Sequence, residues 1–286
     1  MKDRLIVHYL RQLVSILSLG GQPGLRKRLF VSYTRLFFRY ILAVKFSIKK
    51  KAPVRIGRFT IPPTDFGVLR HLFEELFIER IYALALDSDR PVIIDCGSNI
   101  GMSVLFFKEE YPQARILAFE PDPDNFRHLQ SAVSGNFSDV AIYNKAVSDE
   151  PGQMQLYASP DSHGGITTKS LYRERLDDTA VASASVEVVR LSEYLKLPVD
   201  LLKIDVEGAE ISVLRDLIAT GTISRVAKMI VEFHDIKHEG RPPLSEFLAT
   251  LEEQGFELKL AAEPPRSRGR VDTREARDIL IYASRA

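Results

Sequence analysis

The sequence predicts an α/β protein in which a mostly parallel sheet carries helices on both faces. Short apolar runs alternate with amphipathic helical stretches from about Pro91 onward, which is the pattern of repeated strand–helix units. A glycine-containing turn, Cys96 to Gly101, follows the first of these runs and opens a helix. With 286 residues, 45% of them hydrophobic, the chain is long enough for one large domain, or for one domain with an appendage.

The charge distribution divides the chain in two. Residues 1–58 hold 14 Lys and Arg but only one acid, Asp3, and so carry a net charge of +13. The rest holds 25 Lys and Arg against 37 Asp and Glu, a net charge of −12. A split this large predicts a basic extension (residues 1–58) and a main domain (residues 59–286) with different roles.

The sequence of the basic extension predicts two amphipathic helices, Leu5 to Leu19 and Leu25 to Ser47, followed by the cluster Lys49 to Lys51. The favoured interpretation is that their apolar face packs on the main domain or on a partner subunit. Contact with an anionic membrane surface is the alternative, because a basic, aromatic helix suits a lipid interface. No nucleic-acid partner is expected, since no binding motif accompanies the charge.

From Val54 onward the sequence predicts the following elements in order. Val54 to Ile61 is expected to be a hairpin or edge strand, and Asp65 to Ala85 a helix. The later strands are expected at Val92–Asp95, Arg115–Phe119, Val140–Tyr143, Gln153–Tyr157, Val186–Val189, Leu201–Ile204, Lys228–Phe233, Phe256–Leu260 and Asp278–Tyr282. The helices are expected at Met102–Glu110, Asp124–Val133, Ala209–Ala219 and Leu244–Gln254. In such a sheet, ligands bind at the carboxyl edge of the strands.

A turn of the kind that binds nucleotides follows the first apolar run of the sheet. Glycine in such a turn permits positive φ and lets a ligand approach the backbone closely. The start of the next helix offers free N–H groups. Glu120 stands at the end of the next strand, where an acid can accept hydrogen bonds from both ribose hydroxyls.

Two departures from the dinucleotide fingerprint decide which nucleoside is expected. G-x-G-x-x-G needs its later glycines for a pyrophosphate, and here Asn99 and Met102 take those places. Asp95 would repel phosphates, but it would neutralise the cationic amino acid head or the sulfonium of S-adenosyl-L-methionine. The residues therefore favour this cofactor, and an NAD(P)-dependent oxidoreductase is the weaker alternative.

An acid-rich turn follows the strand Leu201–Ile204. Asp205 should emerge at the carboxyl edge of the sheet, where the ligand lies. Glu207 and Glu210 stand at a helix start, where the helix dipole favours acids. We interpret Asp205 as a site residue and Glu210 as a dipole residue, and the sequence leaves Glu207 between the two.

The next strand ends in Glu232, Phe233 and His234. Strand alternation puts Glu232 and His234 on one face, and a histidine at this edge is suited to take up a proton near neutral pH. A structural role for His234 is the alternative. Asp205, Glu207, Glu232 and His234 also have the donor types of a divalent-metal site, but we expect no metal.

Four segments together resemble the FkbM-type methyltransferase family in their order and spacing. They are Val92–Gly101, Phe119–Pro121, Leu202–Glu210 and Val231–His234. The resemblance runs from about Pro91 to Ala286 and leaves out the basic extension. It implies a class I methyltransferase, Rossmann-like fold with a mostly parallel seven-stranded sheet and an antiparallel last strand. It also implies O-methylation of a hydroxyl on a sugar, a glycan or a secondary metabolite.

The resemblance further implies a set of cofactor-binding residues. They are Asp95, Gly97, Ser98, Asn99, Gly101, Glu120, Pro121, Asn144, Ala146 and Asp205. Asp95, Gly97 and Asn99 would line the methionine side of S-adenosyl-L-methionine. Glu120 would bind the ribose, and the stretch from Asn144 to Val147 would approach the adenine.

Methyl transfer of this kind needs alignment of the acceptor and a base. The enzyme places the acceptor oxygen behind the methyl group and excludes water, and a base takes the proton of a weakly nucleophilic hydroxyl. We expect His234 to be the base, with Asp205 or Glu207 orienting it or the acceptor. His163 is the weaker candidate, in a polar stretch from Asp161 to Arg175 that is expected to form an acceptor-binding flap.

The sequence predicts neither export nor a membrane-spanning helix. A single cysteine, Cys96, excludes a disulfide framework and a thiolate zinc site. No run reaches the roughly 18 apolar residues of a spanning helix, and the first 20 residues lack a signal-peptide pattern. We expect a cytoplasmic protein, with attachment to the inner membrane face or self-association through residues 1–58 as alternatives. A non-catalytic, membrane- or complex-associated protein on a methyltransferase scaffold is the alternative function.

Overall fold

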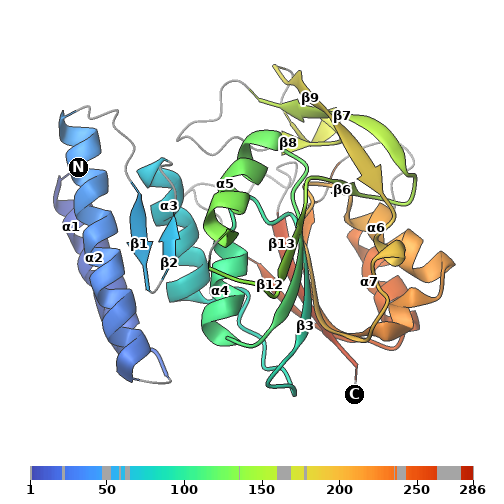
Figure 1. Cartoon of the computed structure of the whole chain (residues 1–286), viewed down its shortest axis with the longest axis horizontal. Helices are drawn as coiled ribbons and strands as arrows, with labels where there is room; N and C mark the ends of the chain where they lie inside the picture. Colours follow the sequence, from blue (N-terminus) through green and yellow to red (C-terminus); the bar gives the residue numbers. More distant parts are fainter. Residues whose placement is uncertain are drawn as a thin grey trace.

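The computed structural model describes residues 2–20, 23–46, 53–57, 59–61, 65–134, 136–159, 169–176, 179–234, 236, 243–262 and 278–285. The centre of this part of the chain is a seven-stranded sheet with the strand order β12-β13-β11-β10-β3-β4-β5 (Figure 1). Its strands are β3 (Val92–Cys96), β4 (Arg115–Phe119), β5 (Val140–Tyr143), β10 (Val199–Ile204), β11 (Val226–His234), β12 (Glu257–Ala262) and β13 (Asp278–Ser284). Neighbours from β5 to β11 are parallel, and β13 is antiparallel to β11 and β12. The predicted sheet with its antiparallel last strand is therefore confirmed.

Helices cover both faces of this sheet. They are α4 (Met102–Glu110), α5 (Pro123–Val133), α6 (Glu210–Ala219) and α7 (Leu244–Glu253). Figure 1 shows α4 and α5 on one face and α6 and α7 on the other. Ile93 packs in the core beneath α4, whereas its neighbour Ile94 packs in the core beneath α6. Burial on both faces explains why these strands are continuous apolar runs in the sequence.

A smaller sheet follows β5, with the order β6-β9-β7-β8. Its strands are β6 (Ala146–Val147), β7 (Gly152–Ala158), β8 (Lys169–Ser170) and β9 (Val181–Val189). Short 3₁₀ turns stand at η2 (Arg173–Arg175), η3 (Leu191–Glu193) and η4 (Thr222–Arg225). Strand β9 is longer than the predicted strand at Val186–Val189, because its first half pairs with β7 while facing solvent. Because this half of β9 is exposed, its residues show little of the apolar pattern from which a strand can be predicted.

The N-terminal part forms a helical hairpin and a strand hairpin. The two helices are α1 (Lys2–Ser18) and α2 (Pro23–Phe46), and the two strands are β1 (Val54–Ile56) and β2 (Phe59–Ile61). The inner face of the helices packs on the main domain, as the favoured interpretation predicts: Tyr33 is fully buried and donates a hydrogen bond to Glu74 at 2.7 Å. The division after residue 58 falls in the turn between β1 and β2, and it stays a prediction.

The helix expected from Asp65 to Ala85 is wrong beyond Glu79. Helix α3 (Phe66–Phe73) continues as a π-helical turn, η1 (Glu74–Glu79), which ends at Arg80 with a φ of 59°. The left-handed residue stops the helix. No described helix is long and apolar enough to cross a membrane. The cluster Lys49–Lys51 and the segment Asp161–Gly165, including His163, lie outside the described residues.

Candidate functional site

The carboxyl ends of four neighbouring strands meet at one edge of the central sheet. Strands β4, β3, β10 and β11 lie side by side, and their parallel register aligns the last residues of β4, β3 and β10, while β11 continues three residues further to His234. Three predicted site residues, Gly97, Glu120 and Asp205, directly follow β3, β4 and β10, and His234 ends β11. The fold therefore brings together residues that are far apart in the sequence.

The loop after β3 is held tightly between β4 and β10. The backbone N–H groups of Gly97 and Ser98 both donate to the carbonyl of Phe119 at 2.9 Å. Gly97 has a φ of 84°, and a Cβ atom there would lie 1.8 Å from the carbonyl oxygen of Asp205. Only glycine fits this position, because the left-handed backbone and the close approach both exclude a side chain. The loop is thereby fixed against the end of β10.

Both carboxylate oxygens of Glu120 are held by the backbone. The N–H of Asn99 donates to Oε2 at 2.7 Å, and the N–H of Asp122 donates to Oε1 at 2.9 Å. An ionised carboxylate offers about four acceptor sites, so Glu120 can still accept hydrogen bonds from two hydroxyls. Burial raises the pKa of Glu120 to about 7, although the two backbone hydrogen bonds act in the opposite direction. A small change of environment therefore decides whether this acid is ionised at neutral pH.

A buried lysine, Lys203, connects β3 and β10 at the site. Its Nζ donates to the carbonyl of Gly97 at 2.7 Å and lies 3.3 Å from the carboxylate of Asp95 and 3.2 Å from that of Asp205. Burial lowers the pKa of Lys203, but Asp205 and Asp95 outweigh burial and bring it above its ordinary value. Burial raises the pKa of Asp205, but Lys203, His234 and Tyr82 together bring it below its ordinary value. Asp205 is therefore ionised at neutral pH.

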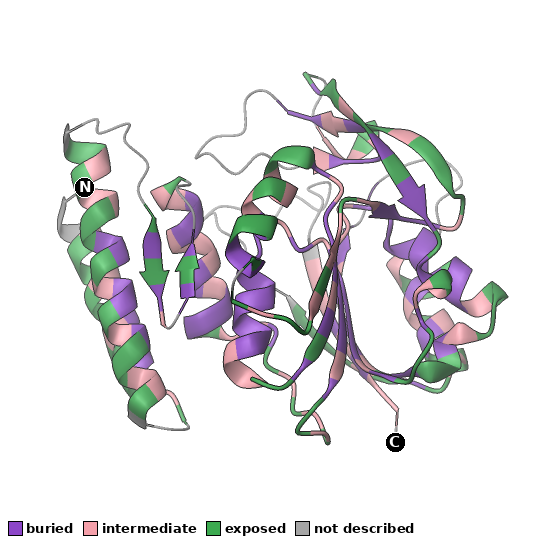
Figure 2. Cartoon of the chain, in the orientation of Figure 1, coloured by how far each residue is buried: buried purple, intermediate pink, exposed green. Residues whose placement is uncertain are grey.

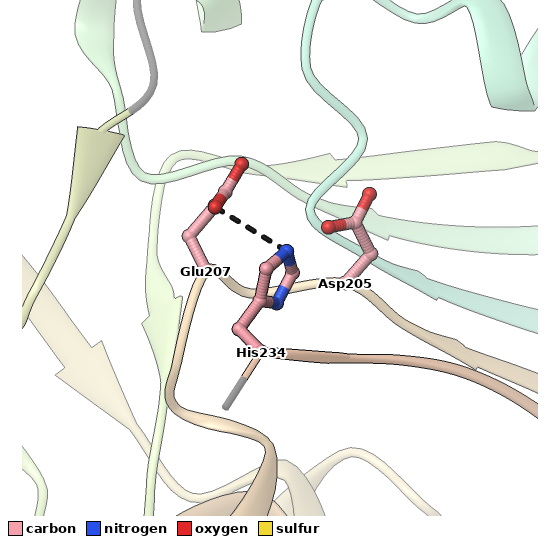
Figure 3. Close-up of side chains that lie close together, drawn as sticks. All are labelled: Asp205, Glu207 and His234. Atoms are coloured by element: carbon pink, nitrogen blue, oxygen red, sulfur yellow. Dashed lines mark ion pairs between the residues drawn. The ribbon is translucent and has the colours of Figure 1, made fainter. Parts of the chain in front are cut away.

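His234 lies between two glutamates, Glu207 and Glu210, and Figure 3 shows it beside Glu207 and near Asp205. Its Nδ1 is 2.8 Å from Oε1 of Glu210, and its Nε2 is 3.4 Å from Oε2 of Glu207. Only 1% of His234 is exposed. Burial lowers the pKa of His234, but Glu210 and Glu207 outweigh this effect and raise it to about 10. The imidazole is therefore protonated at neutral pH, and its neutral, basic form increases with pH.

A pocket opens at this edge of the sheet, between the central sheet and the smaller one. Its walls include seven of the predicted site residues, which are Gly97, Asn99, Glu120, Pro121, Ala146, Asp205 and Glu207. The remaining lining residues are Phe119, Asn125, Lys145, Val147, Leu156, Lys169, Leu171, Val206 and Ala209. Apolar walls with a few polar groups are typical of a small-molecule site.

The other predicted residues lie behind the pocket wall. Asp95 is fully buried and accepts a hydrogen bond from Ser103 at 2.6 Å. Ser98 donates to the carbonyl of Asp95, and the amide of Asn144 donates to the carbonyls of Glu120 and Pro121 at 2.9 Å. Gly101 starts α4 with a φ of 92°, and His234 is also absent from the described wall. These residues shape the loops that form the wall.

Sequence reasoning missed two residues that organise the site. Glu210 was expected to act on the helix dipole alone, yet it also accepts from the N–H of Gly208 at 2.9 Å and contacts His234. Lys203 was not singled out at all. A lysine within a buried apolar strand is itself a signal, because a buried charge needs partners. Its partner Asp95 stands directly beside it in the register of β3 and β10.

One cluster has the donor types of a metal site. Asp205, Glu207 and His234 each bring one such atom within 4.8 Å of the others. However, Lys203 lies 3.2 Å from Asp205, and Arg175 lies 3.1 Å from Glu207. A divalent ion would face both cations, so the arrangement is better suited to holding and moving a proton. The expectation of no metal stays a prediction.

The residues of the pocket fit S-adenosylmethionine. Glu120 has acceptor capacity for a ribose diol, and the wall carries the negative charge of Asp205 for a cationic ligand. Gly97 brings backbone rather than a side chain to the end of the pocket next to Asp205. The wall also carries Lys145 and Lys169, but each is already paired with an acid, Glu187 and Asp122 respectively. A pyrophosphate would therefore meet the carboxylates of Glu120, Asp205 and Glu207 without a free cation in the described wall.

Comparison with known proteins gives one family. The model of the methyltransferase FkbM domain matches residues 95–258, which is more than half of the chain. This match confirms the resemblance that the motifs indicate.

Three curated relatives illustrate the similarity. Methyltransferase 1 of Beauveria bassiana is 35% identical over 164 residues, covering 51% of this chain and 66% of the relative. Methyltransferase sdnD of Sordaria araneosa is 31% identical over 216 residues, covering 65% and 82%. The 31-O-demethyl-FK506 methyltransferase FkbM of Streptomyces tacrolimicus is 29% identical over 235 residues, covering 72% and 88%. The chain thus spans just under two thirds of the first relative and more than four fifths of the other two.

Proposed function

The chain belongs to the FkbM methyltransferase family, and we propose that it transfers the methyl group of S-adenosylmethionine to a hydroxyl of its acceptor. The observation that carries this proposal is Glu120, which lies in the pocket wall with two acceptor sites left for a ribose diol. The Streptomyces relative supports an oxygen acceptor, since it is a 31-O-demethyl-FK506 methyltransferase.

The cofactor site consists of the residues that line the pocket on the side of β3 and β4. All of Gly97, Asn99, Glu120, Pro121, Ala146 and Asp205 line the pocket. Glu120, with Pro121 beside it, would bind the ribose hydroxyls, while Gly97, Asn99 and Asp205 would line the methionine side. Ala146 would approach the adenine. Asp95, Ser98, Gly101 and Asn144 act from behind the wall, by holding the loops in place. When bound, the cofactor supplies a methyl group on a positively charged sulfur.

The chain's own residues handle the acceptor proton. Glu207 lies in the pocket wall and its Oε2 is 3.4 Å from Nε2 of His234. The hydroxyl proton passes through Glu207 to neutral His234, the base, while Glu210 on Nδ1 keeps the imidazole oriented. Asp205 stays ionised and holds the acceptor in line with the methyl group.

The acceptor is a hydroxyl-bearing saccharide or secondary metabolite, and methylation takes place in the cytoplasm. Lys145 and Lys169 join the apolar residues in the pocket wall. Such a mixture of donors and apolar surface suits an acceptor that carries hydroxyls on a carbon skeleton.

The experiment is transfer of labelled methyl groups to a panel of saccharides and polyketides. Transfer should be seen for at least one acceptor, and Glu207→Gln should lower kcat while changing cofactor affinity little. The matched control is Glu253→Gln, at an exposed position of α7 outside the described pocket wall. Cofactor binding without transfer to any acceptor would favour the non-catalytic scaffold instead.

A further inference from the structure

Exposed hydrophobic side chains are concentrated on the two N-terminal helices. Of the twelve large ones that are exposed among the described residues, nine lie on α1 and α2. They are Ile6, Val7, Leu10, Val14, Leu17, Val31, Phe38, Leu42 and Val44. The other three are Val181, Leu197 and Leu260, each on a different part of the chain. Single exposed hydrophobics are ordinary, whereas a concentration on one pair of helices indicates an interaction surface.

On α1 these side chains form one stripe. Val7, Leu10, Val14 and Leu17 follow one another at steps of three and four residues, which places them on one face of the helix. A different face of α1 carries Ile16, which is fully buried in the core. Helix α1 is therefore apolar toward the domain and apolar toward solvent as well. Figure 2 shows the exposed residues along both helices, at the left edge of the view.

On α2 the row of exposed hydrophobics includes one arginine. Val31, Arg35, Phe38 and Leu42 repeat at steps of four, three and four residues, and all four are exposed. The edge of the Phe38 ring contacts Tyr9 of α1, with ring centroids 6.1 Å apart. The exposed surface of α2 thus borders α1 and adds positive charge to the apolar stripe.

We propose that the exposed faces of α1 and α2, here termed the N-terminal face, dock on an anionic lipid bilayer. The face comprises the nine hydrophobic residues above together with the exposed Arg11, Arg35 and Arg39. The apolar side chains enter the interface between headgroups and acyl chains, and the arginines pair with lipid phosphates. Residues 1–58 carry +13 while the remainder carries −12, so an anionic surface attracts this end of the molecule and repels the other.

The same charge disfavours the other occupants. A second copy docked through the same face would bring two segments of +13 together. Nucleic acid would match the charge but would leave the apolar stripe of α1 without a counterpart. Lipid matches both the charge and the apolar surface.

The test is co-sedimentation of the full chain with vesicles of phosphatidylcholine, with and without about 30% phosphatidylglycerol. Binding should be at least about tenfold stronger to the anionic vesicles and should weaken at high salt. The triple variant L10S/V14S/L17S should lose at least about tenfold in binding. The matched control V181S/L197S/L260S, with equally exposed positions elsewhere, should bind like the parent.

A second variant keeps the test decisive if the triple variant misfolds. Arg11→Gln with Arg35→Gln removes two exposed charges and should weaken binding to anionic vesicles only. Equal binding to both kinds of vesicle, or unchanged binding of both variants, would overturn the proposal. So would a dimer that forms without lipid and is lost in L10S/V14S/L17S, since the occupant would then be a second copy. None of these residues belongs to the pocket, so failure here leaves the proposed methyl transfer untouched.

Discussion

Glu120 combines deep burial with a task that requires charge. Burial raises its pKa to about 7, and only the ionised form accepts hydrogen bonds from both ribose hydroxyls. Protons therefore compete with the cofactor below that pH. We expect the affinity for S-adenosylmethionine to fall as the pH is lowered from 8 to 6, by up to about tenfold per pH unit below the pKa. Calorimetric titration at several pH values measures this.

The variant Glu120→Gln separates this effect from general pH sensitivity. The amide cannot accept at both positions, so affinity should fall by about ten- to a hundredfold. Its remaining affinity should also be independent of pH over this range. Glu252→Gln, on an exposed helix position, is the matched control and should behave like the parent. A wild-type affinity that stays constant from pH 8 to pH 6 would contradict the assigned role of Glu120.

His234 gives a second pH prediction, in which neighbouring acids rather than burial raise the pKa. Its glutamate neighbours raise its pKa to about 10, and a base must be neutral to accept a proton. The rate of methyl transfer should therefore rise with pH from 7 and level off near 10. In Glu210→Gln the plateau should begin at least about one pH unit lower, because the largest stabilising charge is gone. Identical profiles for the two proteins would show that His234 is not the base.

The sequence predicts at which edge of the sheet these residues lie, but it does not predict what their side chains contact. Glu120 and Asp205 follow strands whose apolar runs are easily recognised, and both reach the pocket wall. Asp95 also ends such a run, yet it is fully buried because Lys203 and Ser103 hold it from behind. Strand patterns predict at which edge a residue lies. They do not predict which neighbour binds its side chain.

At the scale of elements, the contact between the β3 loop and β10 is the tightest feature of the site. Gly97→Ala would place a methyl group 1.8 Å from a backbone carbonyl oxygen. Backbone shift and a strained φ together should lower the free energy of unfolding by at least about 2 kcal/mol. Gly221→Ala is the control, since Gly221 has a φ of 69° and no atom within 4 Å of the added Cβ. Urea denaturation should show that Gly221→Ala lowers the free energy of unfolding by only about 1 kcal/mol. Equal losses in the two variants would contradict the close contact at Gly97.

The ion network across β3 and β10 predicts another difference. Lys203→Met leaves the carboxylates of Asp95 and Asp205 without their buried cation. The free energy of unfolding should fall by about 3–5 kcal/mol. Lys228→Met removes a lysine whose partner Asp87 is largely exposed, and it should cost less than about 1 kcal/mol. Denaturant unfolding of both variants compares them, and a harmless Lys203→Met would refute the network.

Strands are predicted well where burial on both faces produces a continuous apolar run. The inner strands β3, β4 and β10 have this pattern, and the sequence predicts their positions to within two residues. The end of the helix expected from Asp65 to Ala85 was not predicted correctly. Its apolar residues continue through η1 and past Arg80, where the backbone becomes left-handed. A non-glycine residue gives no sequence signal for that turn.

For the whole molecule, the N-terminal helices and the sheet share one core. Ile16, Leu29 and Leu36 belong to the same buried cluster as Ile93 and Ile116. The charge boundary near residue 58 therefore does not coincide with an edge of the hydrophobic core. The sequence shows where the charge changes, but contacts between distant segments are not visible in it.

A substitution in α2 tests whether the chain unfolds as one unit. Leu36 is fully buried, so Leu36→Ala should lower the free energy of unfolding by about 2–5 kcal/mol. Far-ultraviolet circular dichroism and tyrosine fluorescence should report a single, jointly shifted transition. Leu42→Ala, at an exposed position of the same helix, should have little effect. A transition of the main domain that does not move in Leu36→Ala would show that the extension folds separately.

The ligand of the pocket beside Glu120 can be identified by calorimetric titration of the intact protein at pH 8, first with S-adenosylmethionine and then with NADH. We expect binding of one S-adenosylmethionine per chain and no measurable binding of NADH. Binding of NADH, or no heat with S-adenosylmethionine, would contradict this expectation.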